Sequence, residues 1–431
     1  MNFSLPTKSD LSLRLDQALS PQQHRLLKSV AALADLQQLP LYIVGGFVRD
    51  LLLGRPGLDF DLVVVGDAIG LARALAARQG GTVTNHSKFK TAQWFPPPGA
   101  GMPGFVDFIT ARAEEYKHPA ALPTVKPGTL IDDLRRRDFT INTLALRLDG
   151  HHYGELSDEM GGLEDLQAGI LRTLHSQSFQ DDPTRLFRMV RYEARYGFKI
   201  VPETLALVPG GLLQVNRLSA ERVRHELDLI LEEDNTASIL KRLAKLGILE
   251  SVHPALEWNQ VIQKRFEKGM IAALNLRHSP SRRTLAWALW LMDIPSSDLV
   301  GVEKRLHFDS ALRDMLQAAS SLFAQAGSLA RKKPSQCVAA LDKIPLKAVQ
   351  AVSIGFPPGP TLQVLKNYLE SWRAIKPKTT GHDLKERGLP PGPDYKTFLL
   401  KLRAAWLDGE VNTAEQEVEL LDKLTKTIGG N

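Results

Sequence analysis

The stretch Leu41-Tyr-Ile-Val-Gly-Gly-Phe-Val-Arg-Asp50 changes from an apolar run to a helix-like pattern at the pair Gly45-Gly46. This change predicts a strand, a glycine turn and the start of a helix. Glycine lets backbone N–H groups approach an anion closely, and a helix N-terminus adds partial positive charge. The stretch is therefore typical of a phosphate-binding turn, to which Arg49 would add a full positive charge.

A second apolar run follows at once, Leu58-Asp-Phe-Asp-Leu-Val-Val-Val-Gly66, and its β-branched residues predict a strand. Side chains of a strand alternate between faces, so Asp59 and Asp61 point the same way. Two carboxylates beside a phosphate-binding turn indicate Mg²⁺ and a nucleoside triphosphate, because Mg²⁺ is usually held by carboxylates and substrate phosphates. Each half alone is common in solvated loops and simple turns. Their combination favours a nucleotide site, although not a dinucleotide site, since G-x-G-x-x-G is absent.

A third carboxylate lies on a further expected strand at residues 104–110, where Asp107 stands in the middle. In nucleotidyl transfer, ions held by carboxylates activate the attacking hydroxyl and stabilise the leaving oxygen. Asp107 is therefore a candidate to join Asp59 and Asp61, or to act as the base for that hydroxyl. The alternative is an aspartate at a strand end that pairs with a surface lysine.

Arginine clusters mark two later segments. Asp132-Asp-Leu-Arg-Arg-Arg-Asp-Phe-Thr-Ile-Asn142 enters a helical pattern, and its Arg-Asp pair is suited to grip a triphosphate and a ribose hydroxyl. The second segment begins with the helix-starting run Asp181-Asp-Pro. It is followed by four arginines within roughly a third of the helix circumference: Arg185, Arg188, Arg191 and Arg195. Such a stripe is commonly a solvated face, and the functional interpretation is a wall for phosphates and a base.

Hydrophobic periodicity and turn residues predict the remaining elements of the first 160 residues. We expect one helix before residue 40, a helix over 68–78, a loop over 111–129, and short strands over 81–84, 91–95, 144–148 and 153–156. Beyond residue 160 the pattern is almost entirely helical, and a helix capped by Ser219 is expected.

Composition bounds the class of protein. The chain has 431 residues, which suits several domains, and a formal net charge of +6. The basic balance (pI about 9.2) indicates an anionic partner, most simply nucleic acid, although a merely basic protein would show it too. The single cysteine, Cys337, excludes an intramolecular disulfide and a cysteine zinc site. We expect neither a signal peptide nor a membrane span, and a cytoplasmic location.

Taken in order, the motifs resemble the bacterial (class II) tRNA nucleotidyltransferases and poly(A) polymerases of the polymerase β-like nucleotidyltransferase superfamily. The resemblance covers nearly the whole chain and rests on residues 44–54, 59–61, 133–142 and 181–188. It implies an α+β fold, with a small α/β nucleotidyltransferase head followed by an all-helical neck, body and tail. The implied domains are a catalytic head (1–158), a neck with a nucleotide-selecting helix (159–255), a body (256–330) and a tRNA-binding tail (331–431).

The resemblance also implies the role of each site residue. Asp59, Asp61 and Asp107 would be the catalytic carboxylates and would hold two Mg²⁺ ions. A larger set would bind the nucleotide, through its triphosphate, its ribose or its base. This set is Gly45, Gly46, Arg49, Arg137, Asp138, Asn142, Asp182, Arg185, Arg188 and Arg191.

Within that set, Asp182 and Arg185 would read the incoming base, with Arg188 and Arg191 in support. Cytosine and adenine both present an exocyclic amine beside an acceptor nitrogen, which an Asp/Arg pair matches. Guanine and uracil present a carbonyl beside an N–H and would leave buried polar groups unpaired, which is how a site rejects strongly. The family usually has Glu-Asp at this point, whereas this chain has Asp181-Asp182.

The implied activity is addition of the 3′-terminal CCA to tRNA from CTP and ATP, with release of pyrophosphate. The expected partners are the tRNA acceptor arm, CTP and ATP, with no membrane; the sequence leaves the oligomeric state open. The alternatives are an enzyme that adds only A or only CC, a poly(A) polymerase, a transferase for small molecules, and a non-catalytic RNA-binding protein. A near-normal loop length between Asp107 and Asp133 leans towards full CCA addition.

Overall fold

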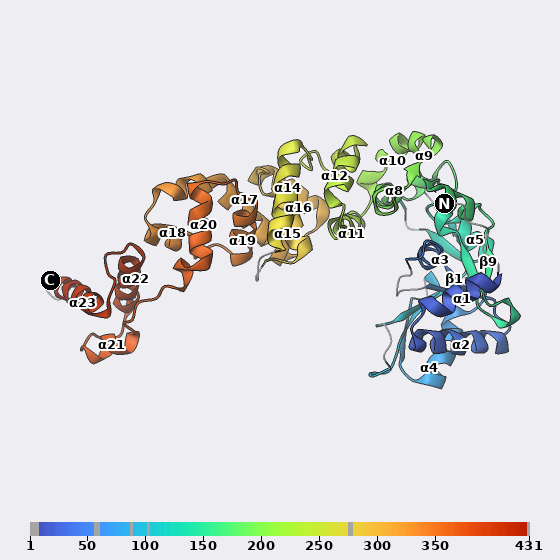
Figure 1. Cartoon of the computed structure of the whole chain (residues 1–431), viewed down its shortest axis with the longest axis horizontal. Coiled ribbons are helices and arrows are strands. Elements are labelled where there is room, and N and C mark those ends of the chain that lie inside the picture. The colour runs from blue at the N-terminus through green and yellow to red at the C-terminus, as the bar shows by residue number, and fades with distance from the viewer. Residues whose placement is uncertain are drawn as a thin grey trace. The chain divides into compact units, whose positions relative to one another are not determined.

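A computed structural model describes residues 8–55, 61–86, 89–100, 104–116, 118–121, 123–274 and 279–428. The chain divides into two compact units, each described by itself below. Unit 1 comprises residues 1–226 with 245–251, and unit 2 comprises residues 227–244 with 252–431. Figure 1 labels the elements of both units.

Unit 1 is built on a seven-stranded mixed sheet with the order β3-β4-β5-β2-β1-β8-β9. All neighbouring strands are antiparallel except β2 and β5, which run parallel. Leu62, Val63 and Val64 bury β2 on both faces, while Asp61 at its start is exposed. The strands are β1 (Leu41–Val44), β2 (Asp61–Val64), β3 (Thr82–His86), β4 (Thr91–Phe95), β5 (Val106–Thr110), β8 (Ala145–Arg147) and β9 (Glu155–Ser157).

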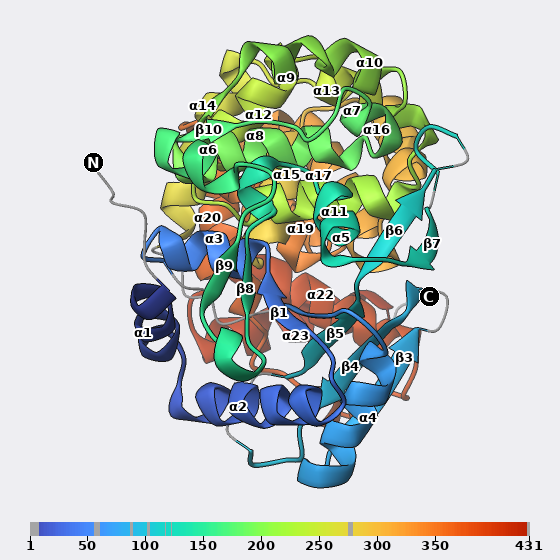
Figure 2. The same ribbon diagram turned by 90° about the vertical axis from the view of Figure 1, so that its right-hand side faces the viewer.

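Helices cover this sheet. α4 packs beside β3, β4 and β5 (Figure 2). On the face towards which Val63 points, Leu134 of α5 packs with Val63 and Ala111. The residues that follow α5 lie near Asp61 at the start of β2. The helices of this part are α1 (Lys8–Ala18), α2 (Pro21–Leu36), α3 (Gly46–Leu52), α4 (Ala68–Gln79) and α5 (Leu130–Arg135).

The strand, turn and helix expected around Gly45-Gly46 are confirmed, and three other expectations for this part are wrong. Two helices, not one, precede residue 40. The expected loop over 111–129 contains an antiparallel hairpin, β6 (Arg112–Glu115) with β7 (Thr124–Pro127). The helical pattern expected over residues 132–142 is interrupted, because α5 ends at Arg135 and the chain then forms a separate 3-10 turn, η2 (Thr140–Asn142).

The rest of unit 1 is helical apart from one strand pair, β10 (Ile170–Leu171) with β11 (Lys199–Ile200). The expectation of an all-helical neck is wrong at this pair. Gly169 and Gly197 each end the helix before them in a left-handed conformation (φ +67° and +70°). After each glycine the backbone continues as a short extended segment. The helices are α6 (Gly162–Ala168), α7 (Ser178–Asp181), α8 (Thr184–Tyr196), α9 (Pro202–Ala206) and α10 (Val208–Leu212).

The two units divide within α11 (Ala220–Leu231), whose start is capped by Ser219 as expected. Unit 2 is helical throughout its described part. Its core contains the stacked rings of Trp287 and Trp290, with centroids 5.4 Å apart. Its further helices, with two that lie at the division, are α12 (Thr236–Lys245), α13 (Ile248–Val252), α14 (Gln260–Ala273), α15 (Arg282–Leu291), α16 (Ser296–Leu306), α17 (Ser310–Gln325), α18 (Pro334–Leu341), α19 (Leu346–Gly355), α20 (Pro360–Glu370), α21 (Gly381–Glu386), α22 (Pro393–Leu407) and α23 (Ala414–Ile428).

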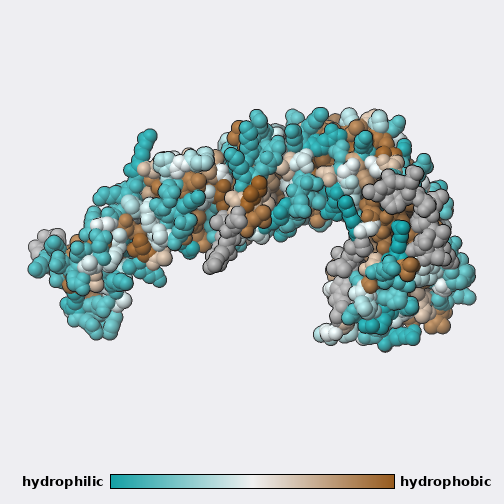
Figure 3. Space-filling view, in the orientation of Figure 1, coloured by the Kyte–Doolittle hydropathy of each residue, from teal (hydrophilic) through white to brown (hydrophobic). Residues whose placement is uncertain are grey.

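The surface and the helix lengths bear on membrane contact. Within the described ranges, no helix combines the length and the apolar character that a bilayer crossing requires. Figure 3 shows hydrophilic residues over much of the visible face.

Candidate active site

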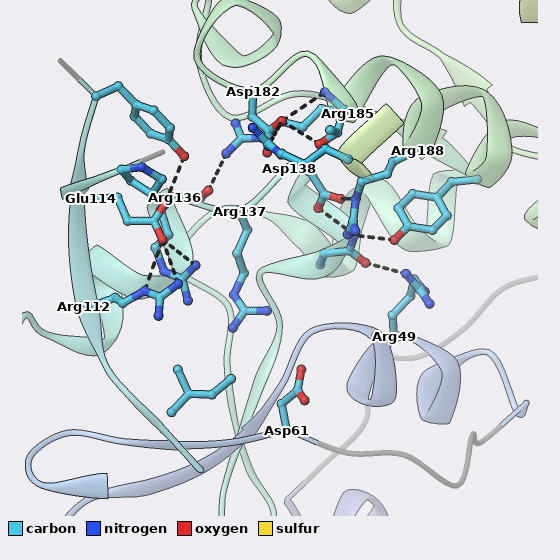
Figure 4. A pocket seen from close by; sticks show the side chains of 18 residues that line it. Arg49, Asp61, Arg112, Glu114, Arg136, Arg137, Asp138, Asp182, Arg185 and Arg188 are labelled. Atoms are coloured by element: carbon cyan, nitrogen blue, oxygen red, sulfur yellow. Dashed lines mark hydrogen bonds and ion pairs between the residues drawn. The ribbon is translucent and has the colours of Figure 1, made fainter. Parts of the chain in front are cut away.

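A pocket of about 510 Å³ lies in unit 1, between the start of β2, the segment after α5 and the start of α8. Its described lining carries seven arginines and the four carboxylates of Asp61, Glu114, Asp138 and Asp182. The surplus of positive charge suits a polyanion such as a triphosphate. Figure 4 shows Arg137 reaching into the centre, towards the side where Asp61 lies. The arginines are Arg49, Arg112, Arg136, Arg137, Arg185, Arg188 and Arg222.

The parallel strands β2 and β5 bring two of the expected carboxylates together. Asp61 and Asp107 are direct partners in the register, so their side chains lie on the same face of the sheet. Asp61 lines the pocket; Asp107 does not, although Ile109 on the same face does. Asp59 lies outside the described residues. Adjacent carboxylate oxygens suit Mg²⁺, but the described residues contain no group of three or more His, Cys, Asp and Glu that could hold a metal ion.

The glycine turn is shaped by a close approach of Arg137. Gly45 has φ +69°, and a Cβ atom there would lie 2.6 Å from Nη1 of Arg137. The Gly45 N–H donates to the carbonyl oxygen of Leu144 (3.0 Å), so this amide already has a partner. Gly46 begins α3 and lines the pocket. The turn therefore makes room for a guanidinium as well as for a phosphate.

Arg49 is held in place rather than presented to the solvent. Only 4 % of it is exposed, and it pairs with Asp50 (Nε to Oδ1, 2.8 Å). Its Nη1 donates to Oδ1 of Asn142 (2.6 Å), and its guanidinium lies over the rings of Tyr196 and Tyr192. Arg49 therefore ties α3 to α8 and contributes its charge to the pocket wall.

Asp138 continues this chain of contacts. Its Oδ2 accepts from Nε of Arg188 (2.7 Å), and its Oδ1 accepts from Nδ2 of Asn142 (2.8 Å). Burial alone would raise the pKa of Asp138, but the Arg188 guanidinium and the Asn142 amide lower it to about 2. Asp138 is therefore a carboxylate at neutral pH, and Asn142 links it to Arg49.

The expected base-reading pair is fixed by its neighbours. Oδ1 of Asp182 accepts from the hydroxyl of Thr184 (2.6 Å) and from Nη2 of Arg222 (2.7 Å). Arg185, 5 % exposed, donates from Nη1 to Oγ of Ser178 (2.7 Å) and from Nη2 to the carbonyl oxygen of Arg136 (2.6 Å). These contacts use one oxygen of Asp182 and two of the five N–H groups of Arg185. Both side chains line the pocket and keep hydrogen-bonding capacity for a ligand.

Arg188 and Arg191, the two arginines of α8 that were expected to support the base-reading pair, have different surroundings. Arg188 lines the pocket with about a third of its side chain exposed. Arg191 is buried and does not line it; its Nη2 lies 3.6 Å from Oε2 of Glu226. Burial raises the pKa of Glu226, against the lowering effect of Arg191. Arg191 thus supports the contact between α8 and α11 rather than the ligand.

Sequence reasoning missed one cluster of charges, centred on Glu114. This carboxylate, 6 % exposed, accepts from Arg112 (Nη2, 3.0 Å), Arg136 (Nη1, 3.1 Å) and the hydroxyl of Tyr116 (2.9 Å). Arg136 also pairs with Asp133 (2.6 Å), which holds Arg137 as well (2.9 Å). The cluster fixes the hairpin β6–β7 to the segment after α5. Its only sequence signal is the spacing of Arg112 and Glu114, which places both on one face of a strand.

Known proteins resemble this chain in sequence over most of its length. Residues 41–172 match the family model of the poly A polymerase head domain, and residues 197–259 match that of the probable RNA and SrmB-binding site of polymerase A. The A-adding tRNA nucleotidyltransferase of Halalkalibacterium halodurans is 31 % identical over 422 residues, which cover 94 % of this chain and 93 % of that protein. The A-adding tRNA nucleotidyltransferase of Geobacter sulfurreducens is 34 % identical over 420 residues; the match covers 93 % of this chain but only 47 % of that longer protein.

A solved structure extends the similarity to the fold. The Thermotoga maritima CCA-adding enzyme, complexed with tRNA, matches with a TM-score of 0.77 and 27 % identity over 96 % of this chain and 98 % of that one. The chain belongs to the family of bacterial (class II) tRNA nucleotidyltransferases and poly(A) polymerases.

Proposed function

We propose that this protein is a tRNA nucleotidyltransferase that adds the 3′-terminal CCA to tRNA from CTP and ATP and releases pyrophosphate. The proposal rests on one observation: a single basic pocket is lined by Asp61 at the start of β2 and by the pair Asp182 and Arg185 near the start of α8. This is the combination that a site needs to hold the reacting phosphate and to read a base. A tRNA substrate would place the enzyme in the cytoplasm.

In this proposal the arginines of the pocket hold the triphosphate. Arg137 and Arg188 are only partly buried and would neutralise charge on the phosphate oxygens. Three further residues act indirectly, by holding other side chains in place: Asp138, Asn142 and Arg49. The Asp138 carboxylate fixes Arg188, and Asn142 joins that pair to Arg49, so the charged wall is set before the nucleotide arrives. Such preorganisation avoids reorganisation during the reaction.

Asp182 and Arg185 would select the base. The free oxygen capacity of Asp182 accepts from the exocyclic amine of cytosine or adenine, and the remaining N–H groups of Arg185 donate to the neighbouring ring nitrogen. Guanine or uracil would place a carbonyl against the carboxylate and an N–H against the guanidinium. The mismatch leaves buried groups unpaired, which strongly disfavours these bases.

We propose that two Mg²⁺ ions are held by Asp61 and Asp107, together with Asp59. The register that sets Asp61 beside Asp107 fits this assignment, since both supply hard oxygen ligands on one face. When bound, such ions lower the pKa of the attacking hydroxyl and stabilise charge on the leaving oxygen. The chain's own part is to hold the carboxylates side by side on two interior strands and to direct Arg137 towards the same side.

The test uses three tRNAs that end before CCA, after the first C and after CC. Each is incubated with the protein and Mg²⁺, with CTP and ATP supplied singly and together, and products are sized at nucleotide resolution. Growth of all three substrates to the CCA end, followed by a stop, is the expected result. A long ladder of added A residues, or no addition at all, would overturn the proposal.

The second candidate is an enzyme that adds only the terminal A. The observation that favours it is the name of two relatives reported above, which are A-adding enzymes. In the same assay this enzyme would extend only the CC-ended tRNA, by one A, and would ignore CTP. A stop at CC would instead indicate the CC-adding specialist.

A further inference from the structure

Tyr192 of α8 stands in the positive wall of the active-site pocket. It lines the pocket although only 6 % of it is exposed. The guanidinium carbons of Arg49, Arg188 and Arg191 lie 5.1, 5.6 and 5.6 Å from the centroid of its ring. A cation is attracted to the negative face of an aromatic ring, so these contacts fix the ring as well as the arginines. The hydroxyl of Tyr192 is therefore held in one place at the pocket surface.

The hydrogen bonds of this hydroxyl are incomplete. A phenolic hydroxyl has one proton to donate and also accepts. The Tyr192 oxygen accepts from Nη2 of Arg188 (3.0 Å; Figure 4), but among the described residues no group accepts the Tyr192 proton. Tyr116, the other tyrosine of the pocket lining, already donates to Oε2 of Glu114 (2.9 Å). A buried donor without a partner is costly, so the Tyr192 proton calls for an acceptor on the ligand.

The position of Tyr192 on α8 indicates which part of a nucleotide it meets. Arg185, Arg188 and Tyr192 share one face of the helix, at spacings of three and four residues, and all three line the pocket. Seven residues separate Arg185 from Tyr192, which is about 10 Å along the helix axis. With the edge of the base at Arg185, the sugar of the same nucleotide lies in the direction of Tyr192.

The carboxylate that the sequence offers for the ribose is already occupied. Oδ1 of Asp138 accepts from the Asn142 amide (2.8 Å) and from the backbone N–H of Phe139 (2.8 Å). Its Oδ2 accepts from Nε of Arg188 (2.7 Å), and the residue is 5 % exposed. Asp138 therefore fixes Arg188, and Arg188 in turn fixes the hydroxyl of Tyr192.

We propose that the Tyr192 hydroxyl donates a hydrogen bond to a ribose hydroxyl of the incoming nucleotide, with Arg188 as the positioning residue. The inference rests on the proposed function, which supplies the nucleotide. By donating to the phenolic oxygen, Arg188 leaves the Tyr192 proton for the ligand. A site that is built to bond a hydroxyl disfavours an analogue without it, because the buried donor is then left unpaired.

The test compares nucleotides that differ only in the sugar. Binding of ATP, 2′-deoxy-ATP and 3′-deoxy-ATP, and of the same three forms of CTP, is measured by calorimetry on the full-length protein with Mg²⁺. Tyr192→Phe removes the hydroxyl but keeps the ring between its arginines. This variant should bind ATP and CTP roughly tenfold more weakly than wild type. It should bind one of the two deoxy forms as well as wild type does, because that form lacks the acceptor, and its identity shows which hydroxyl is bonded.

Tyr196→Phe is the matched control. Tyr196 lies one turn further along α8, its hydroxyl donates to Oδ1 of Asp50 (3.1 Å), and it is not part of the pocket lining. Its variant should leave the ratios of affinity between ribose and deoxy forms at their wild-type values.

Two results would overturn the proposal. If Tyr192→Phe weakens all three forms equally, the hydroxyl acts only through Arg188; if the affinity for ATP and CTP is unchanged, it makes no contact. Nucleotide addition to tRNA is measured in parallel. A wild-type protein that binds nucleotides but transfers none would refute the proposed function, whereas the binding comparison would still decide the role of Tyr192.

Discussion

The pocket of unit 1 and a second pocket, in unit 2, have almost the same volume, about 510 and 520 Å³, but hold their positive charges in opposite ways. In unit 1 most of the pocket's arginines are paired with carboxylates, Arg185 is held by the Ser178 hydroxyl and the carbonyl oxygen of Arg136, and Arg49 and Arg185 are nearly buried. This first arrangement fixes the direction of each donor, which selection of a base requires.

In the pocket of unit 2 the backbone is tied down instead. Arg403 donates from Nε to the carbonyl oxygen of Ile375 (2.9 Å) and from Nη2 to that of Arg373 (3.3 Å). The exposed side chains of Arg373 and Lys376 extend freely from this backbone. This second arrangement fixes only the position of charge, which is sufficient for the phosphate contacts of the tRNA-binding tail that the family resemblance implies.

The largest effect should come from Asp61, which only the first pocket contains. Asp61→Ala, and equally Asp61→Asn, should lower kcat for nucleotide addition by on the order of 10³-fold, because the carboxylate charge that would hold Mg²⁺ is lost. Binding of tRNA should stay within about twofold of wild type, since the contacts in unit 2 are intact. Single-turnover incorporation and anisotropy measure the two quantities. Retained activity would contradict the assignment of Asp61 as a metal ligand.

A substitution of Arg185 tests whether the hydrogen bonds that fix this side chain are needed for selection of the base. Arg185→Ala should reduce discrimination against GTP and UTP by roughly 100-fold while tRNA binding is unchanged, because a buried donor set no longer rejects the wrong base. The measurement is incorporation of each of the four nucleotides in separate reactions. Arg195→Ala, at the exposed end of the same helix, is the matched control. An unaltered preference for C and A in the Arg185 variant would rule out the base-reading role.

The ion pair and hydrogen bond of Asp138 in the first pocket should also contribute to the free energy of unfolding. Its pKa in the folded protein, about 2, is below the value of about 3.9 expected for an unfolded chain. A depressed pKa contributes stability that is present above pH 4 and is lost as the pH falls towards 2. Asp138→Asn should therefore lower the free energy of unfolding by about 2 kcal/mol at pH 7, and the difference from wild type should shrink between pH 4 and pH 2. Urea unfolding across this range measures it; a difference that does not vary with pH would contradict the charge assignment.

Much of the fold around the first pocket could be predicted, because its elements carry their own local signals. The apolar run before Gly45, the β-branched run after Asp61 and the stripe of arginines in α8 each predict an element and its orientation. The break between α1 and α2 was missed although it has a local signal, since Ser20 and Gln23 form a capping box around Pro21.

The missed features of the site depend on long-range pairing of charges. β6 has no hydrophobic alternation, because Arg112 and Glu114 face other charges rather than a core. In the same way, nothing local shows that Arg49 is bound by Asn142, 93 residues away, or that Arg191 is turned towards Glu226. The sequence therefore predicts the chemical character of the site, which is a basic pocket with carboxylates. It does not predict which of these side chains face the ligand and which hold another residue in place.

The smallest predicted effect separates two neighbours in that hairpin. Glu114 is 6 % exposed and pairs with Arg112 and Arg136, whereas Glu115 is 64 % exposed and pairs with Lys126. Glu114→Gln should lower the free energy of unfolding by about 1–2 kcal/mol, because buried guanidinium groups lose a charged acceptor. Glu115→Gln should change it by less than about 0.5 kcal/mol, as is usual for exposed pairs. Urea unfolding of both variants at neutral pH gives the comparison.

Because Arg185 donates to the carbonyl oxygen of Arg136, the Glu114 variant should also raise the KM for ATP and CTP, and the Glu115 variant should not. Equal behaviour of the two variants would mean that the hairpin does not help to hold the first pocket in shape, and the contrast with the backbone-anchored pocket of unit 2 would then rest on α8 alone.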